Sequence, residues 1–204
     1  MTVPELYEKL NSDRFQKPEI GDLFYNFFIY QYDADKEYEM RRHIKEFKEN
    51  LVRPNSYVDA FTVDLFDIFC QYLDEMPFMD NPSMLKFLLE AEAEDSEVSE
   101  QVKETLSMNA HSREFIEYLH SKILAYKEHP DDGMKRPYVF LYGVGAMDPY
   151  LRVNELLAMY EEFNLTDQYK IVVFYPGHRV ENSFSLFDLL PDHHTYRATL
   201  LINE

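Results

Sequence analysis

The segment from Pro137 to Leu157, PYVFLYGVGAMDPYLRVNELL, constrains the fold more than any other part of the sequence. Its apolar run YVFLY is typical of a strand that is covered on both faces. Gly143 and Gly145 then allow a sharp turn, because glycine adopts backbone angles that other residues avoid. Asp148 and Pro149 predict a helix start, since an aspartate caps free amides and proline suits the first helical position. Strand, glycine turn and helix together form half of a βαβ unit.

Other segments of the chain show the same two patterns. Apolar or aromatic runs predict strands at residues 23–32, 56–63, 170–175 and 196–202, and apolar residues at helical spacing predict helices at residues 33–51 and 64–76. Asp33 and Asp35 are expected to cap the first of these helices. Pro176 and Gly177 are expected to close the strand before them. This alternation predicts an α/β fold with three α/β/α layers and a mostly parallel central sheet of about five strands.

The region from residue 77 to about residue 130 differs from the rest of the chain. After Pro77 and Pro82 its composition is helical and polar, and Ser112 is expected to cap a helix near its end. Six acidic residues without an intervening basic one lie between Glu90 and Glu100, where a solvated turn is favoured over a calcium site. We interpret this region as a helical insertion in a single domain that spans residues 1–204.

The charge of the chain limits its partners. A formal net charge of −18 repels phosphate backbones, which disfavours direct nucleic-acid binding and suits a basic protein partner. Such acidity also serves solubility alone. Four Arg and Lys side chains lie between Arg41 and Lys48, but glutamates are interleaved with them. A solvated helix face and a nucleic-acid patch therefore both remain open for this helix.

Cysteine usage and hydropathy bear on the cellular compartment. Cys70 is the only cysteine, which excludes an intramolecular disulfide and a cysteine-based zinc site within one chain. The N-terminus lacks the apolar core of a signal peptide, and no run of about 18 apolar residues occurs. We therefore expect a cytoplasmic protein without a membrane segment.

Familiar catalytic and cofactor motifs are missing from the sequence. The turn GVGAMDP has no lysine or hydroxyl for a P-loop, and Asp148 stands where a dinucleotide loop has its third glycine. Asp192, His193 and His194 are adjacent in the chain, and adjacent residues of an extended segment point to opposite faces, so they predict an exposed loop and no metal site. No GxSxG motif occurs. We expect no catalytic residues, no metal and no cofactor.

Two arginines are placed where a sheet edge could bind an anion. Arg152 follows the glycine turn, and Arg197 lies at the start of the last predicted strand. Either could hold a carboxylate or phosphate. Alternatively, Arg152 pairs with a nearby acid such as Glu155 or Asp148.

Four segments of the C-terminal third carry a family resemblance. FLYGVGAMDPYLRVNELL, VVFYPG, SLFDLL and YRATLLI, in this order and spacing, resemble the signature of the BrxB family of bacteriophage-exclusion (BREX) systems. The positions that match the family pattern are Gly143, Gly145, Pro149, Arg152, Tyr175, Pro176, Gly177, Leu186, Phe187, Tyr196, Arg197 and Ala198. The resemblance implies membership of an antiphage operon that also encodes a large ATPase, a DNA methyltransferase and PglZ, a protein with a phosphatase-like fold. It implies no assigned catalytic activity.

These observations predict a non-catalytic interaction subunit of a cytoplasmic BREX complex. PglZ is the first candidate partner and the large ATPase the next. The alternative is a small-anion or nucleotide-binding sensor or enzyme that uses the carboxyl edge of the sheet. The candidate binding residues are Gly143, Gly145, Asp148, Arg152, Tyr175, Gly177, Tyr196 and Arg197.

Overall fold

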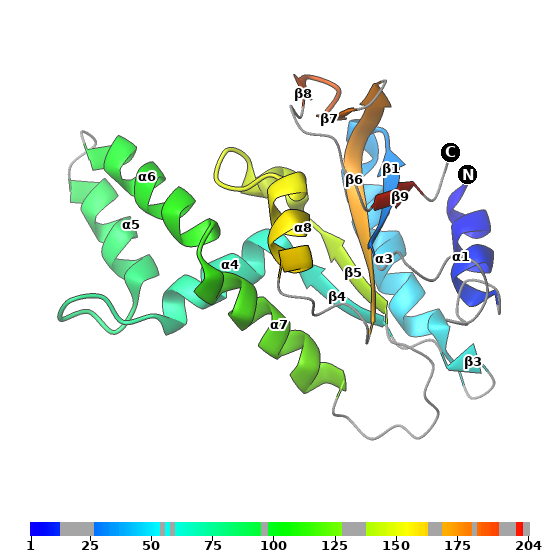
Figure 1. The fold of residues 1–204 in the computed structure, drawn as a ribbon, viewed down its shortest axis with the longest axis horizontal. Helices are drawn as coiled ribbons and strands as arrows, with labels where there is room; N and C mark the ends of the chain where they lie inside the picture. The colour runs from blue at the N-terminus through cyan, green and yellow to red at the C-terminus, as the bar shows by residue number, and fades with distance from the viewer. Residues whose placement is uncertain are drawn as a thin grey trace.

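The fold is that of an α/β protein built on a mixed sheet (Figure 1). It is seen in a computed structural model that describes residues 1–12, 27–53, 56–57, 60–94, 98–127, 138–162, 169–180, 183–191 and 199–201. The α/β class predicted from the sequence is confirmed.

The sheet has a parallel part and an antiparallel extension. Parallel pairing joins the strands in the order β4 (Ala60–Asp64), β5 (Tyr138–Tyr142), β6 (Lys170–Val180), β1 (Phe27–Tyr32) and β9 (Thr199–Leu201). The far end of β6 pairs with β7 (Ser183–Leu186), which pairs with β8 (Leu190–Pro191), both antiparallel. A separate antiparallel pair is formed by β2 (Val52–Arg53) and β3 (Ser56–Tyr57).

Buried side chains lie on both faces of the parallel strands. In β1, Phe28 and Tyr30 join one apolar cluster, whereas Phe27 and Ile29 join the other, as the two-residue period of a strand requires. The first cluster also contains residues of α1 (Val3–Asn11) and α3 (Glu37–Leu51). The second cluster contains residues of α4 (Leu65–Glu75), α5 (Met84–Glu94), α6 (Ser99–Ala110), α7 (Arg113–Lys127) and α8 (Val153–Glu162). Burial on both faces explains why the strand sequences are continuously apolar.

The long helices predicted from the sequence are present, but two of them do not begin where the sequence predicted. Ser112 caps α7, because its hydroxyl accepts a hydrogen bond from the amide of Phe115 at 3.1 Å. Asp33 makes no side-chain cap and precedes a short 3₁₀ helix, η1 (Ala34–Lys36). Its carboxylate lies instead 3.4 Å from Nε2 of His178. A side chain expected to act locally thus has its contact in a distant strand.

The predicted helix start at Asp148 and Pro149 is wrong. The glycine turn leads into a 3₁₀ helix, η3 (Val144–Met147), and Asp148 follows it with extended backbone angles. Helix α8 begins only at Val153, where the carboxylate of Glu155 accepts a hydrogen bond from the amide of Arg152 at 2.9 Å. The amide that precedes the helix is therefore satisfied by a residue inside its first turn.

The predicted strand at residues 56–63 is divided. β4 belongs to the large sheet, whereas Ser56 and Tyr57 pair with β2, the two residues that follow α3. The β-branched and aromatic residues of this stretch are typical of a strand, but residue type does not indicate which strand is the partner.

Pro176 and Gly177 do not close β6 as predicted. They lie where the strand changes partners, because Pro176 is opposite Tyr32 of β1 and Gly177 is opposite Leu186 of β7. The amide of Phe187 donates to the Pro176 carbonyl at 2.7 Å. Gly177 has a φ of 137°, and a Cβ there would lie closer than 3.0 Å to the backbone carbonyl of Ser185. Only glycine fits this crossing of backbones.

We predict that Gly177→Ala lowers the free energy of unfolding by about 2 kcal/mol or more, because both its backbone angle and the Ser185 carbonyl reject a methyl group. Urea unfolding followed by circular dichroism measures the change. Val180→Ala, at the exposed end of the same strand, is the control and should cost less than about 0.5 kcal/mol. Equal effects of the two substitutions would contradict this role of Gly177.

Candidate functional site

The carboxyl edge of the parallel strands is the place where α/β folds of this kind bind ligands. β1 ends there at Tyr32, β4 at Asp64 and β5 at Tyr142. Together with Glu37 and Arg41 of α3, these residues form a connected group, which we call the carboxyl-edge cluster.

Asp64 is the centre of this cluster. It is buried at the junction of β4 and α4. One carboxylate oxygen, Oδ1, accepts hydrogen bonds from the amides of Phe66 at 3.1 Å and Asp67 at 3.4 Å, so Asp64 is the N-cap of α4. The other oxygen, Oδ2, lies 2.6 Å from Nη1 of Arg41. A negative charge thus already occupies the helix N-terminus, where an anionic ligand would otherwise be stabilised.

Arg41 links α3 to this helix start. Its Nε donates to Oε1 of Glu37 at 2.8 Å, and its guanidinium lies over the ring of Tyr142 with 5.3 Å between Cζ and the ring centroid. Burial lowers the pKa of Arg41, but the hydrogen bonds and charges of Glu37 and Asp64 outweigh burial and raise it. Glu37 also accepts a hydrogen bond from the hydroxyl of Tyr32. Burial, and then the charge of Glu37, raise the pKa of that phenol, which stays protonated as the donor.

The two glycines of the turn after β5 make room for the protein's own side chains. Gly143 has a φ of 70°, and a Cβ there would lie closer than 3.0 Å to the Asp64 carboxylate. A Cβ on Gly145 would meet the ring of Phe187 equally closely. In the observed structure the spaces beside both glycines are therefore filled by protein atoms.

Asp148 and Arg152 lie beyond this turn and form an ion pair. Nη2 of Arg152 is 2.8 Å from Oδ1 of Asp148. This is the pairing that the sequence offered as the alternative to anion binding by Arg152. An added anion at this position would compete with the carboxylate of Asp148.

The other predicted binding residues are spread along β6 or fall beyond the described ranges. Tyr175 is buried in β6, with its ring centroid 5.4 Å from that of Phe184 in a T-shaped contact. Gly177 lies against β7, as described above. Tyr196 and Arg197 lie outside the described residues, as do Asp192, His193 and His194.

The described residues contain no group of three or more His, Cys, Asp or Glu side chains that could hold a metal ion. In the same part of the chain, no helix has the length and apolar character needed to cross a bilayer. Arg42 of the basic α3 face lies 4.0 Å from the carboxylate of Glu46, with both side chains exposed, which agrees with a solvated helix face.

Most of the carboxyl-edge cluster was not predicted as a site. Glu37 and Arg41 are four residues apart, a spacing that does indicate a helical ion pair. Asp64 directly precedes an apolar helix, which indicates an N-cap. The link between Arg41 and Asp64 joins residues 23 positions apart, and no local pattern indicates it.

Comparison with known proteins gives a consistent result. A family model described as "BREX protein BrxB" matches residues 61–201. A protein of Bacillus cereus (strain H3081.97) named "BREX protein BrxB" is 24% identical over 179 residues, which are 87% of this chain and 84% of that protein. One of the same name from Escherichia coli O9:H4 (strain HS) is 22% identical over 206 residues, covering 98% of this chain and 90% of that protein. No solved structure matches significantly.

We predict that Asp64→Ala lowers the free energy of unfolding by about 2–4 kcal/mol, because it removes the cap of α4 and leaves Arg41 without one of its two carboxylates. Asp64→Asn keeps an oxygen for the cap and should cost less. Glu46→Ala, which removes an exposed pair with Arg42, should cost less than about 1 kcal/mol. Chemical denaturation of the three variants gives the order, and equal costs for Asp64→Ala and Glu46→Ala would refute the central place of Asp64.

Proposed function

We propose, since this chain belongs to the BrxB family of phage-defence BREX proteins, that it is a non-catalytic interaction subunit of a cytoplasmic BREX complex. Its proposed partner is another product of the same operon, with PglZ first and the large ATPase next. The architecture that we propose is a three-layer α/β/α domain with a mostly parallel sheet, in which residues 77–130 are a helical insertion.

The protein's own charged side chains fill the carboxyl edge, and this supports the non-catalytic part of the proposal. A substrate phosphate or carboxylate at the start of α4 would have to displace Asp64, which accepts two amide hydrogen bonds and pairs with Arg41. Such displacement costs both the cap and the ion pair. The edge is built to hold α3, β4 and α4 together, which supports a structural use of this part of the fold.

Charge supports the interaction part of the proposal. At a net charge of −18 the chain attracts basic partners and repels nucleic acid. Electrostatic attraction of this kind speeds association with a partner of opposite charge and favours that partner over others.

The small-anion or nucleotide sensor remains an alternative prediction. It would use Gly143, Gly145, Arg152, Gly177 and Arg197 at the same edge. The pairing of Arg152 with Asp148 at 2.8 Å weighs against it, because the arginine would have to exchange a covalently tethered carboxylate for a free anion.

We predict that the tagged chain, expressed together with its whole BREX operon, recovers PglZ in a near-stoichiometric amount after a wash at moderate salt. Mass spectrometry of the eluate gives the ratio. Recovery of the chain alone would contradict the interaction-subunit proposal.

A ligand panel separates the two functions. With ATP, GTP or inorganic phosphate at saturating concentration, we expect no rise in the melting temperature. A sensor would gain on the order of 2.7 kcal/mol of stability at a hundredfold excess over the dissociation constant. A clear rise with any of these ligands would favour the sensor.

A further inference from the structure

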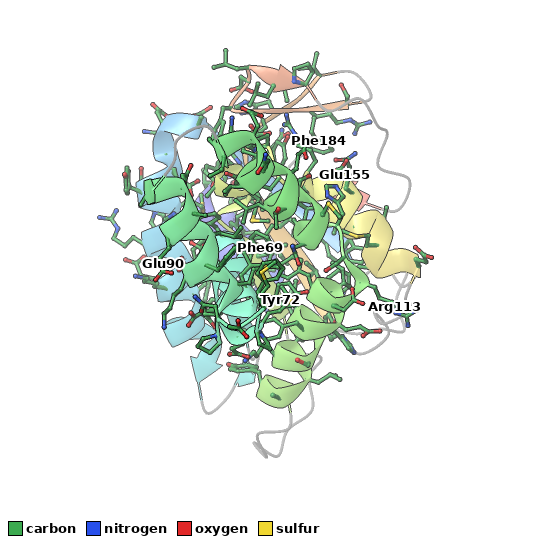
Figure 2. All side chains as sticks on the ribbon, turned by 90° about the vertical axis from the view of Figure 1, so that its left-hand side faces the viewer. Phe69, Tyr72, Glu90, Arg113, Glu155 and Phe184 are labelled. Carbon is green, nitrogen blue, oxygen red and sulfur yellow. The ribbon has the colours of Figure 1, made fainter. Side chains whose placement is uncertain are left out.

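A helical projection extends away from the sheet (Figure 1) and has surface properties of its own. We call residues 77–110 the arm; it consists of the turn after α4, helix α5 and helix α6. Figure 1 shows α5 and α6 extending away from the sheet, and Figure 2 looks onto this side of the molecule, with Glu90 of α5 labelled. The arm is anchored by buried residues, among them Met84, Leu88 and Val102.

The arm exposes large apolar side chains. Met79 is 81% exposed in the turn, Leu89 is 56% exposed on α5 and Met108 is 75% exposed on α6. A single exposed apolar residue needs no explanation, whereas three on one projecting unit make this unit a candidate contact surface.

Met79 is displayed by a turn with a fixed conformation. The amides and carbonyls of Phe78 and Asn81 exchange two hydrogen bonds of 2.9 Å. The ring of Phe78 lies 4.9 Å from that of Phe87, between centroids, which attaches the turn to α5. Between these anchors Met79 has a φ of 52°, a left-handed angle that Asn or Gly adopts at lower cost. Since its side chain is mostly exposed, packing within the chain does not explain a methionine here.

Exposed acidic side chains lie on the same two helices as Leu89 and Met108. The arm has eight acidic residues and only two lysines. On α6, Glu104 and Met108 are four residues apart, and on α5, Leu89 and Glu92 are three apart, so Met108 and Leu89 each share a helix face with a carboxylate. Glu92 and Glu104 are both exposed.

We propose that the arm is the docking surface for a basic amphipathic helix of the protein partner. This inference rests on the proposed function, because it identifies the surface through which the interaction subunit acts. An amphipathic helix would place apolar side chains against Met79, Leu89 and Met108 and direct lysines or arginines to the surrounding glutamates. Methionine suits such a surface, since its unbranched side chain adapts to different partners. A second copy of this chain is a poorer occupant, because two acidic surfaces repel each other.

The first test uses charge reversal within the same operon pull-down. The triple variant Glu90→Lys, Glu92→Lys and Glu104→Lys should lower recovery of the partner on the order of tenfold, because three attractive contacts become repulsive. The matched control is Glu8→Lys, Asp35→Lys and Glu162→Lys, which changes the net charge equally at exposed sites outside the arm. The control should stay within about twofold of the unaltered chain if location, and not total charge, decides binding.

The second test removes apolar contacts without changing charge. Leu89→Ser with Met108→Ser should weaken recovery, whereas Val180→Ser with Leu189→Ser, at exposed positions of the β6–β7–β8 hairpin, should not. Melting temperatures near that of the unaltered chain show that each variant is folded.

Cross-linking with a carbodiimide, which joins carboxylates to amines, tests the chemistry of the partner in the intact complex. Links from Glu90, Glu92 or Glu104 to lysines three or four residues apart in one partner segment are expected. Unchanged recovery of the partner with the arm variants would overturn the proposal that the arm is the docking surface. Links only to a second copy of this chain would do the same, and the proposed function would stand in both cases. If the unaltered chain recovers no operon product, the proposed function fails and the arm inference with it.

Discussion

The contact between Arg41 and Asp64 joins the parts of the structure on which the rest depends. Arg41 belongs to α3, whose apolar residues join one buried cluster, and Asp64 caps α4, whose apolar residues join the other. The pair meets at the end of β4, 2.6 Å apart. Because one carboxylate serves both the helix cap and the ion pair, it fixes α3 to the start of α4. Gly143 is required next to this carboxylate, because a Cβ at that position would clash with it.

Much of the fold could be predicted because its signals are local. Continuous apolar runs predicted β5 and the first part of β6, and apolar residues at helical spacing predicted α3 and α4. Ser112 predicted the start of α7, whereas α5 and α6 were expected only as a helical region. The errors arose where a residue has a partner other than the one that its local pattern indicates. Pro176 and Gly177 were interpreted as a strand end, yet they mark the change from β1 to β7. Asp148 was interpreted as a cap, yet it pairs with Arg152. Within the site, Glu37 and Arg41 could be paired from their spacing, whereas the contact of Arg41 with Asp64 depends on the crossover of α3 and could not.

The distribution of charge gives the molecule two distinct regions. At the carboxyl edge, Arg41 and Arg152 lie in short contacts with carboxylates. On the arm, carboxylates greatly outnumber lysines and lie beside exposed methionine and leucine side chains. Charges that are already paired contribute to stability and little to recognition, whereas unbalanced charge beside apolar surface favours binding of a partner with the opposite pattern. This contrast is why we assign the interaction of this BrxB-family chain to the arm and a structural role to the edge.

Hydrogen exchange of the chain, free and in complex with its BREX partner, tests the central claim most directly. If the arm is the docking surface and the carboxyl edge is structural, amides of α5 and α6 become protected in the complex, while those of residues 142–152 exchange as in the free chain. Protection confined to residues 142–152 and the region of Gly177, with α5 and α6 unchanged, would contradict this account and return the function to the edge of the sheet.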